Sequence, residues 1–139
     1  MINRVLLIGN VGLDPEIRSL ESGVKVARLR IATNEHFSTV SGVRKEHTEW
    51  HTVVLWRSMA DFAERNIHKG SQVFVEGKIR SRERIDSMGI KKTYYEVHAD
   101  EIRLLGRREH HHHPEQSEFS SGNDISDETV TFGGDGMPF

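Results

Sequence analysis

The side chains best suited to chemistry in this 139-residue chain are cations that recur at every second position of one segment. Within residues 72–85, the even positions from 78 onward hold Lys78, Arg80, Arg82 and Arg84, whereas the odd positions are mostly apolar. Because successive residues of a strand point to opposite faces, these four cations share one face. Like charges on one face repel, and a bound polyanion would remove that repulsion. A solvated strand edge that blocks pairing with other chains is the alternative interpretation.

Two further groups of cations favour the anion-binding interpretation. Arg28 and Arg30 lie on the polar side of the alternating segment 24–33, and Arg44 and Lys45 lie in the polar stretch that follows it. Cations that gather from more than one element are typical of a surface that contacts phosphate groups. We therefore predict eight phosphate-contacting residues: Arg28, Arg30, Arg44, Lys45, Lys78, Arg80, Arg82 and Arg84.

The segment 49–56 adds aromatic side chains. One face of a strand here would carry Trp50, Thr52, Val54 and Trp56, and the other would carry His51, Val53 and Leu55. A small barrel has one interior, so an inward aliphatic face would turn both tryptophans outward, toward the arginines. Two core tryptophans are the alternative. We expect Phe37, in the preceding loop, to join the outward tryptophans, because single-stranded nucleic acids need flat platforms for bases beside cations for phosphates.

The elements that must position these residues follow from the hydrophobic pattern. Strands are predicted over residues 4–9, 24–33, 49–56, 72–85 and 93–102, with a polar loop or hairpin over 34–47. A helix is predicted over 58–68, with Ser58 as its N-cap and an apolar stripe of Met59, Phe62, Ala63 and Ile67. Three strands, one short helix and two strands predict an all-β fold, the five-stranded Greek-key barrel of the oligonucleotide-binding (OB) type.

The charge is divided along the chain. All 19 Lys and Arg residues and 14 of the 21 Asp and Glu residues precede residue 109, so residues 1–108 carry +5 and residues 109–139 carry −7. The last segment is also sparse in apolar residues and lacks a helical or strand period. Such a composition cannot bury enough surface to offset its ordering entropy. We predict one folded domain over 1–108 and a disordered acidic tail over 109–139.

The composition also excludes several kinds of chemistry. A chain without cysteine has no disulfide, thiolate metal site or cysteine nucleophile, and no apolar run approaches the roughly 18 residues of a membrane span. The four consecutive histidines from His110 to His113 lie in the predicted tail, and we interpret them as adventitious rather than as a metal site. No phosphate loop or catalytic spacing is recognisable. We therefore expect no enzyme, no metal and no cofactor.

Three motifs resemble those of the bacterial single-stranded DNA-binding protein family. They are NVGLDPEIR at residues 10–18, TEWHTVVLW at 48–56 and KGSQVFVEG at 69–77, in the order and at the spacing of that family. Together they cover most of residues 1–105. The last five residues resemble the acidic Pro-Phe tip of the same family, and they are Asp135, Gly136, Met137, Pro138 and Phe139.

The resemblance implies an OB fold, assembled as a homotetramer, that wraps single-stranded DNA in the cytoplasm, at the nucleoid. It also implies that the tail tip docks onto proteins of replication, recombination and repair. By position, Trp50 and Trp56 fall on base-stacking sites, and Phe37 falls where the family often has a stacking tryptophan. Arg84 departs from the family, since many members carry another stacking tryptophan there. The tip departs too, with Asp135 as its one acid and Met137 in place of the usual Ile or Leu.

Two other classes of function remain open at this stage. One is an OB-fold RNA-binding protein, which would lack the 48–56 motif and the acidic tail. The other is a replication-restart accessory factor on the same fold, which would lack the Pro-Phe tip. The sequence does not distinguish a chromosomal from a plasmid or phage origin, nor does it give the site size on DNA.

Overall fold

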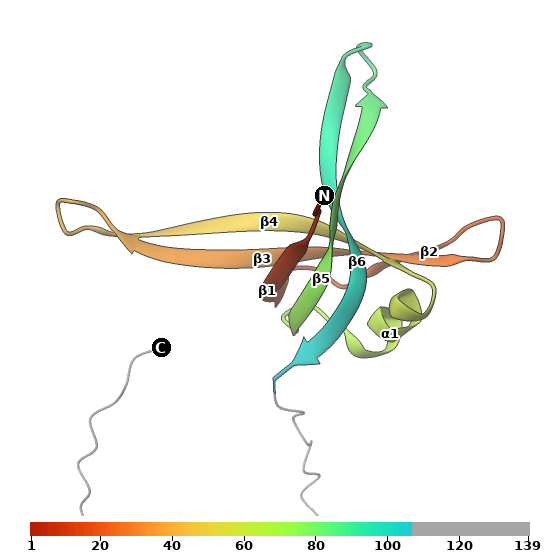
Figure 1. Cartoon of the computed structure of the whole chain (residues 1–139), viewed down its shortest axis with the longest axis horizontal. Coiled ribbons are helices and arrows are strands. Elements are labelled where there is room, and N and C mark those ends of the chain that lie inside the picture. The colour runs from red at the N-terminus through yellow and green to blue at the C-terminus, as the bar shows by residue number, and fades with distance from the viewer. Residues whose placement is uncertain (107–139) are drawn as a thin grey trace, which may run out of the picture. The chain divides into compact units, whose positions relative to one another are not determined.

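The computed structural model describes residues 1–106, which form six strands and one helix (Figure 1). The elements follow in the order β1 (Val5–Val11), β2 (Glu16–Ser19), β3 (Lys25–Ser38), β4 (Arg44–Trp56), α1 (Ser58–Asn66), β5 (Gln72–Ile85) and β6 (Lys91–Leu105). The strand order in the sheet is β1-β5-β6-β4-β3-β2, and β1 also pairs with β3. Five strands therefore close into a barrel, and β2 is added to β3 outside it. The predicted OB-type barrel is confirmed.

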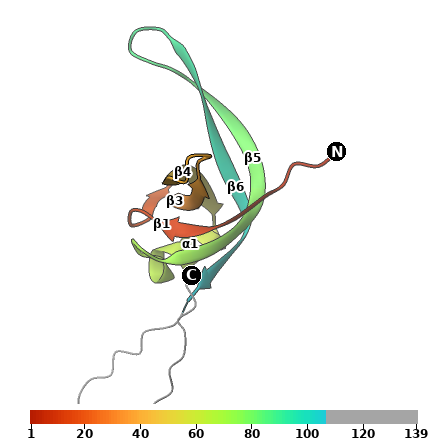
Figure 2. The same ribbon diagram turned by 90° about the vertical axis from the view of Figure 1, so that its left-hand side faces the viewer.

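The barrel interior is filled by side chains from every barrel strand and from the helix. Leu29, Ile31, Val53, Leu55, Val73 and Val75 are fully buried there. Alternation places these residues on the inner face because both neighbours of each one along the chain point away from the core. Ala60 and Ala63 of α1 are also fully buried, and the helix lies at the end of the barrel opposite the β5–β6 hairpin tip (Figures 1 and 2).

Strands β3, β4 and β6 extend beyond their predicted limits, whereas β5 has the predicted bounds. Of the two alternatives for residues 34–47, the hairpin is confirmed, because the antiparallel ladder between β3 and β4 continues to the pair Ser38↔Arg44. We call residues 34–48 the β3–β4 arm, and the part of the β5–β6 hairpin beyond the pair Ile79↔Val97 the β5–β6 arm. Both arms project from the barrel (Figure 1). Their side chains are almost all exposed, so no core face marks either arm in the sequence, although the alternating cations do mark the β5 half of the β5–β6 arm. The short strand β2 was also not predicted.

The start of the helix differs from the prediction. The N-cap is Arg57, at φ 57°, and no side chain caps the helix, so Ser58 is the first helical residue. Asp61 binds Lys25 of β3 instead of the helix N-terminus, with 2.9 Å between Oδ1 and Nζ, and Glu64 binds the same ammonium at 2.6 Å. The hydrogen bond from Lys25 lowers the pKa of the Asp61 carboxyl. Two acidic side chains of α1 therefore tie the helix to one lysine of β3.

Strands β5 and β6 approach each other most closely at Gly77. A Cβ atom added there would lie 2.2 Å from the His98 carbonyl oxygen and 2.9 Å from its carbon. The ladder changes register at this point, from Glu76↔Glu101 to Gly77↔Ala99, so that Asp100 has no opposite residue. This is a β-bulge in β6, a feature that bends a strand and increases its twist. Only a residue without a side chain fits at position 77.

We expect Gly77→Ala to destabilise the barrel by about 1–3 kcal/mol, because the new methyl group must displace the backbone of β6. Urea denaturation followed by tryptophan fluorescence measures this change. Ser81→Ala is the matched control, since Ser81 lies on the same face of the same strand and is exposed. Equal stability of the two variants would show that β5 and β6 can separate at this point without cost.

Candidate nucleic-acid interface

Trp50 and Trp56 lie on the outer face of β4. Of the residues between them on the inner face, Val53 and Leu55 are fully buried. The pairs Arg28↔Val54 and Arg30↔Thr52 place both arginines on the same outer face as the tryptophans. Trp50 is 48% exposed, and Trp56 is half-buried. The structure therefore places the tryptophans beside the arginines, as the alternation predicts, and not in the core.

Trp50 is held between an arginine and a glycine. The guanidinium carbon of Arg30 lies 5.8 Å from the centroid of the Trp50 ring, and Arg30 Nη1 donates a hydrogen bond to Thr52 Oγ1 at 3.1 Å. On another side, a Cβ at Gly12 would lie 2.4 Å from Cζ3 of the indole. Gly12, in the first of the three motifs, therefore leaves the space that the Trp50 ring occupies.

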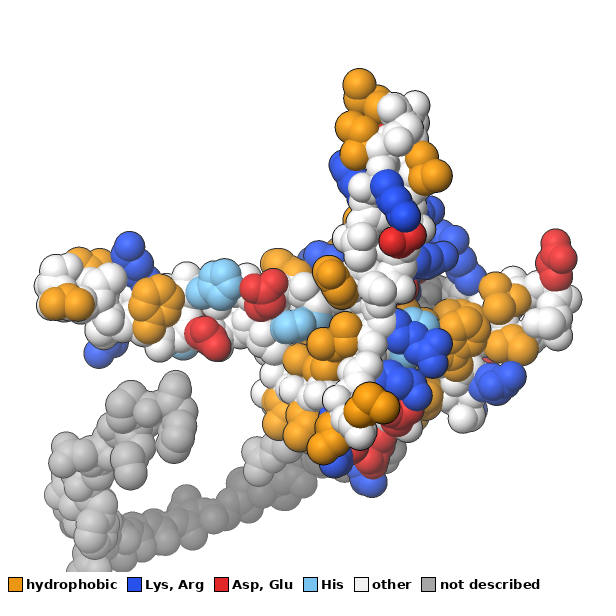
Figure 3. Space-filling model, turned by 45° about the horizontal axis from the view of Figure 1, so that its top comes forward, with side chains coloured by type: hydrophobic (Ala, Val, Ile, Leu, Met, Phe, Trp, Pro, Cys, Tyr) orange, Lys and Arg blue, Asp and Glu red, His pale blue; other side chains and the backbone are white. Residues whose placement is uncertain are grey.

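Trp56 borders a groove of about 410 Å³ on the outer face of the barrel. Five strands contribute to it, and its lining consists of Glu16, Arg18, Leu20, Val26, Arg28, Val54, Trp56, Arg80, Ser81, Arg82, Glu96 and His98. Lys and Arg side chains gather along the β5–β6 arm and on the barrel face beside it, next to hydrophobic and histidine side chains (Figure 3). An aromatic ring and several cations therefore border one cavity of nucleotide size.

The cations of this face differ in how far they are already neutralised. Arg28 Nη2 lies 3.0 Å from the buried carboxylate of Glu96, and Arg82 Nη1 lies 3.9 Å from the other oxygen of the same carboxylate. Lys78 lies 3.8 Å from Asp100. Within residues 1–106, Arg80 and Arg84 have no carboxylate within ion-pair distance. Arg30, which is hydrogen-bonded to Thr52 but to no carboxylate of the described residues, is available for an external anion together with these two arginines.

Three residues of β6 belong to this face and were not predicted. The register pairs Lys78, Arg80, Arg82 and Arg84 with His98, Glu96, Tyr94 and Lys92. Paired residues of neighbouring strands share a face, so Tyr94, Glu96 and His98 lie among the predicted cations. This pairing depends on the bulge at Asp100. Without the extra residue, the odd-numbered residues of β6, and not the even-numbered ones, would lie opposite the cations of β5. Tyr94 is 48% exposed and offers a further aromatic platform.

Phe37 does not join the tryptophans, and this expectation is wrong. Phe37 lies in β3, where it pairs with Lys45, whereas Trp50 pairs with Ala32. Five residues separate Phe37 from Ala32 in an uninterrupted strand, so the two lie on opposite faces of the ribbon. Phe37 and Lys45 therefore share the other face of the β3–β4 arm, while Arg44 shares the face of Trp50. A hollow of about 420 Å³ lies at this arm, between His36, Phe37, Ser38, Arg44, Lys45 and Glu46.

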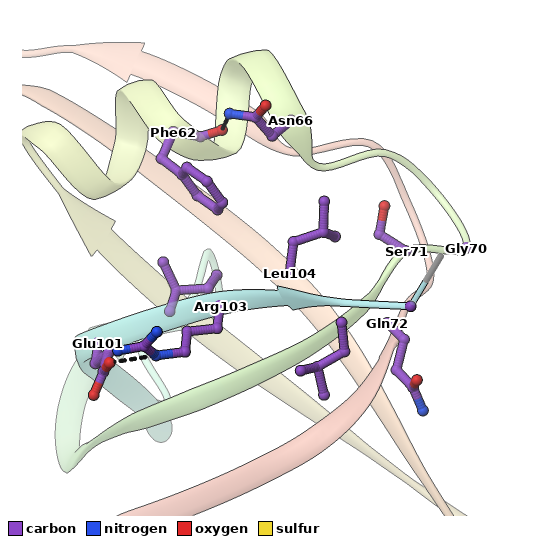
Figure 4. Close-up of a pocket in the computed structure, with 11 residues that line it drawn as sticks. Phe62, Asn66, Gly70, Ser71, Gln72, Glu101, Arg103 and Leu104 are labelled. Carbon is purple, nitrogen blue, oxygen red and sulfur yellow. Dashed lines mark hydrogen bonds and ion pairs between the residues drawn. The ribbon is translucent and has the colours of Figure 1, made fainter. Parts of the chain in front are cut away.

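A larger hollow of about 920 Å³ lies between α1 and the end of β6. Phe62 of the helix and Leu104 of the strand point into the space between these two elements (Figure 4). The one cation of its lining, Arg103, is bound through Nε to Glu101 Oε1 at 2.6 Å. This hollow offers no free positive charge to a polyanion, and we do not assign phosphate binding to it.

Several predictions of the sequence concern residues outside the described part of the chain. They include the tail over 109–139, the docking tip from Asp135 to Phe139, and His110–His113. Within residues 1–106, no group of three or more His, Asp or Glu side chains is arranged to hold a metal ion. The helix in that part of the chain is too short to cross a membrane.

A closed OB barrel with outward tryptophans beside a cationic groove is typical of OB-fold nucleic-acid-binding proteins. A model of the single-strand binding protein family matches residues 2–105. The chain belongs to the single-strand binding protein family.

Known proteins of this kind resemble the chain in sequence and in structure. Single-stranded DNA-binding proteins of Neisseria meningitidis serogroup A / serotype 4A and of serogroup B are each 39% identical over 107 residues, 77% of this chain. The matched region spans 62% of the length of these relatives. The structure of a Plasmodium falciparum SSB in complex with ssDNA matches with a TM-score of 0.70 and 28% identity, over 76% of this chain and 96% of that one.

We expect the unpaired arginine Arg80 to contribute more to the salt dependence of anion binding than a paired one. Removing one phosphate contact flattens the slope of log K against log salt by about 0.7 for a single strand. Arg80→Ala should show this change with a dT oligomer. Arg103→Ala is the control, because Arg103 is ion-paired away from the groove. An unchanged slope for Arg80→Ala would favour the solvated-edge interpretation of the arginine face.

We also expect Tyr94 to act as a stacking platform. Tyr94→Ala should cost about 1–3 kcal/mol of binding to a dT oligomer, the usual contribution of one base–aromatic stack. Its neighbour Tyr95 is the matched control, because it is 70% exposed but pairs with Ser81 on the opposite face of the arm. Equal losses for Tyr94→Ala and Tyr95→Ala in a fluorescence titration would show that the face of the arm is irrelevant to binding.

Proposed function

We propose that this protein binds single-stranded DNA without sequence specificity. The observation that carries the proposal is the outer face of the barrel, where Trp50 and Trp56 lie beside Arg28, Arg30 and the arginines of β5. Bases would stack on the tryptophans, and the backbone phosphates would lie along the cations. Stacking and phosphate contacts carry little base information, so every sequence would bind with similar strength.

A single strand fits this face better than a duplex does. The bases of a duplex are stacked on one another and closed to aromatic platforms, and duplex readers usually place a helix in the major groove. The one helix of the described chain is short and carries Arg65 as its single cation. The groove beside Trp56, by contrast, is of nucleotide size and is bordered by Arg80 and Arg82.

The predicted contacts divide into two surfaces. The first is the groove face of the barrel and the β5–β6 arm, with Arg28, Arg30, Lys78, Arg80, Arg82 and Arg84 as phosphate contacts. The second is the β3–β4 arm, where Phe37 would stack on a base and Arg44 and Lys45 would bind phosphates. A strand that leaves the barrel along this arm would meet both sets of residues.

The protein is proposed to act as a homotetramer. Leu6 and Ile8 on the outer face of β1 are each 58% exposed, and Ile8 pairs with the half-buried Phe74 of β5. Such an apolar patch gains stability when a second copy covers it. We propose that β1 forms part of the contact between copies.

The tail is proposed to recruit proteins of DNA replication, recombination and repair, in the cytoplasm at the nucleoid. The tip from Asp135 to Phe139 combines an aromatic ring, a proline and one acidic side chain, which a basic-rimmed apolar pocket of a partner would capture. Deleting Phe139 should abolish capture of such partners and leave the affinity for DNA unchanged. Weaker DNA binding by this variant would contradict a role confined to docking.

Light scattering with and without a dT oligomer tests binding and assembly together. A mass of roughly 64 kDa, four times the 15.9 kDa chain, is expected without DNA, and a larger mass with it. In the absence of DNA, Leu6→Glu should lower the mass, whereas Leu20→Glu, which changes an exposed leucine of the turn after β2, should not. A mass near that of one chain would contradict the tetramer.

Competition between DNA and RNA oligomers of equal sequence tests the substrate. We expect DNA to displace bound RNA at lower concentration than RNA displaces bound DNA. A preference for RNA would favour an RNA-binding function on the same fold, and weak binding of both would favour an accessory factor.

A further inference from the structure

His98 of β6 lies in the groove and is hydrogen-bonded to Trp56 of β4. Trp56 Nε1 donates to His98 Nδ1 at 3.3 Å, and the two ring centroids are 6.1 Å apart with their planes tilted by 31°. An indole N–H is a donor only, so His98 Nδ1 must be the acceptor and must carry no proton. The proton of the neutral imidazole is then on Nε2.

Glu96 faces this second ring nitrogen. Its Oε1 lies 3.9 Å from His98 Nε2 and its Oε2 lies 3.0 Å from Arg28 Nη2. The carboxylate is buried and attracts the Nε2 proton, so both neighbours of the imidazole favour the same tautomer. A continuous line of polar contacts therefore runs from Trp56 through His98 and Glu96 to Arg28, joining an aromatic side chain of the groove to one of its cations.

We propose that neutral His98 is a positioning residue for single-stranded DNA binding, and that it holds the Trp56 indole in the orientation that stacks on a base. This role rests on the proposed function. Trp56 is the last residue of β4, is half-buried and borders the groove, so core packing does not enclose its ring on every side. The terminal torsion of an aromatic side chain is broad, and a hydrogen bond to the indole nitrogen narrows it. A ring that is already oriented loses less entropy when a base binds.

The charge state of His98 decides whether the bond exists. Burial lowers the pKa of His98, the Glu96 carboxylate acts in the opposite direction, and Arg80 and Lys78 add to the lowering. The other charged groups that line the groove are Arg28, Arg82, Glu16 and Arg18. The imidazole is therefore neutral near pH 7. As the pH falls through the pKa of His98, Nδ1 gains a proton and opposes the indole N–H, so the bond is lost.

The test uses a Trp50→Phe background, in which Trp56 is the remaining tryptophan of the two in the chain. His98→Asn places an amide oxygen near the position of Nδ1 and does not titrate, whereas His98→Val removes the acceptor. At pH 7, quenching of Trp56 by a dT oligomer should give His98→Val a dissociation constant about 2- to 12-fold weaker than the background, the range of one net hydrogen bond. His98→Asn should bind like the background.

The pH profile separates positioning from other roles of a histidine. At raised salt, where added charge matters least, the affinity of the background relative to His98→Asn should fall as the pH is lowered through the pKa of His98. A ratio that rises instead would identify His98 as a phosphate contact and overturn the proposal. Equal affinities of His98→Val and the background would also overturn it.

A titration without DNA distinguishes failure of this role from failure of the proposed function. The fluorescence of Trp56 should change with pH in the background protein but not in His98→Asn, and Trp56→Phe, which retains Trp50, should lack the change. Absence of that change would refute the His98–Trp56 bond whatever the protein binds. If the change occurs but even wild-type protein binds no single-stranded DNA, the proposed function fails, and the positioning role fails with it.

Discussion

The groove depends on the close crossing of β5 and β6 at Gly77. The missing side chain lets the β6 backbone approach, and the bulge at Asp100 shifts the ladder by one residue at the same point. Because side chains alternate with a period of two, this single extra residue turns His98 and Glu96 outward while Val97 and Ala99 remain in the core. One local feature of the backbone therefore places the polar side chains of β6 in the groove.

Burial of Glu96 among the cations gives the face its electrostatic character. Four cations on one strand would repel one another, and the carboxylate opposite them offsets part of that repulsion before any ligand binds. Its contacts are with Arg28 and Arg82, so within residues 1–106 the cations of this face without a carboxylate partner are Arg30, Arg80 and Arg84. A buried carboxylate is stable only when it is paired and hydrogen-bonded. The groove is therefore a balanced polar network and not a simple patch of positive charge.

The barrel and its arms are held together by different interactions. In the barrel, aliphatic side chains from all five strands exclude water and determine which face of each strand points inward. In the arms, two-stranded ribbons are exposed on both faces, so backbone pairing holds them together and both faces remain free for contacts. Such ribbons have little stability of their own, and their connection to the barrel supports them. Residues as different as Phe37 and Arg44 can therefore project from one arm in opposite directions.

The sequence by itself determined the fold class, the cationic face of β5 and the outward position of Trp50 and Trp56. Each of these follows from alternation within one strand and from the fact that a small barrel has a single interior. It did not determine the length of the β3–β4 arm, the cap of α1 or the face of Phe37. An exposed ribbon such as the β3–β4 arm has no buried face, so its sequence carries no apolar alternation. The position of Tyr94, Glu96 and His98 among the cations could be recognised only in the tertiary structure. The register between β5 and β6 determines which face of β6 lies beside the arginines. One bulged residue shifts this register by one position and so exchanges the two faces.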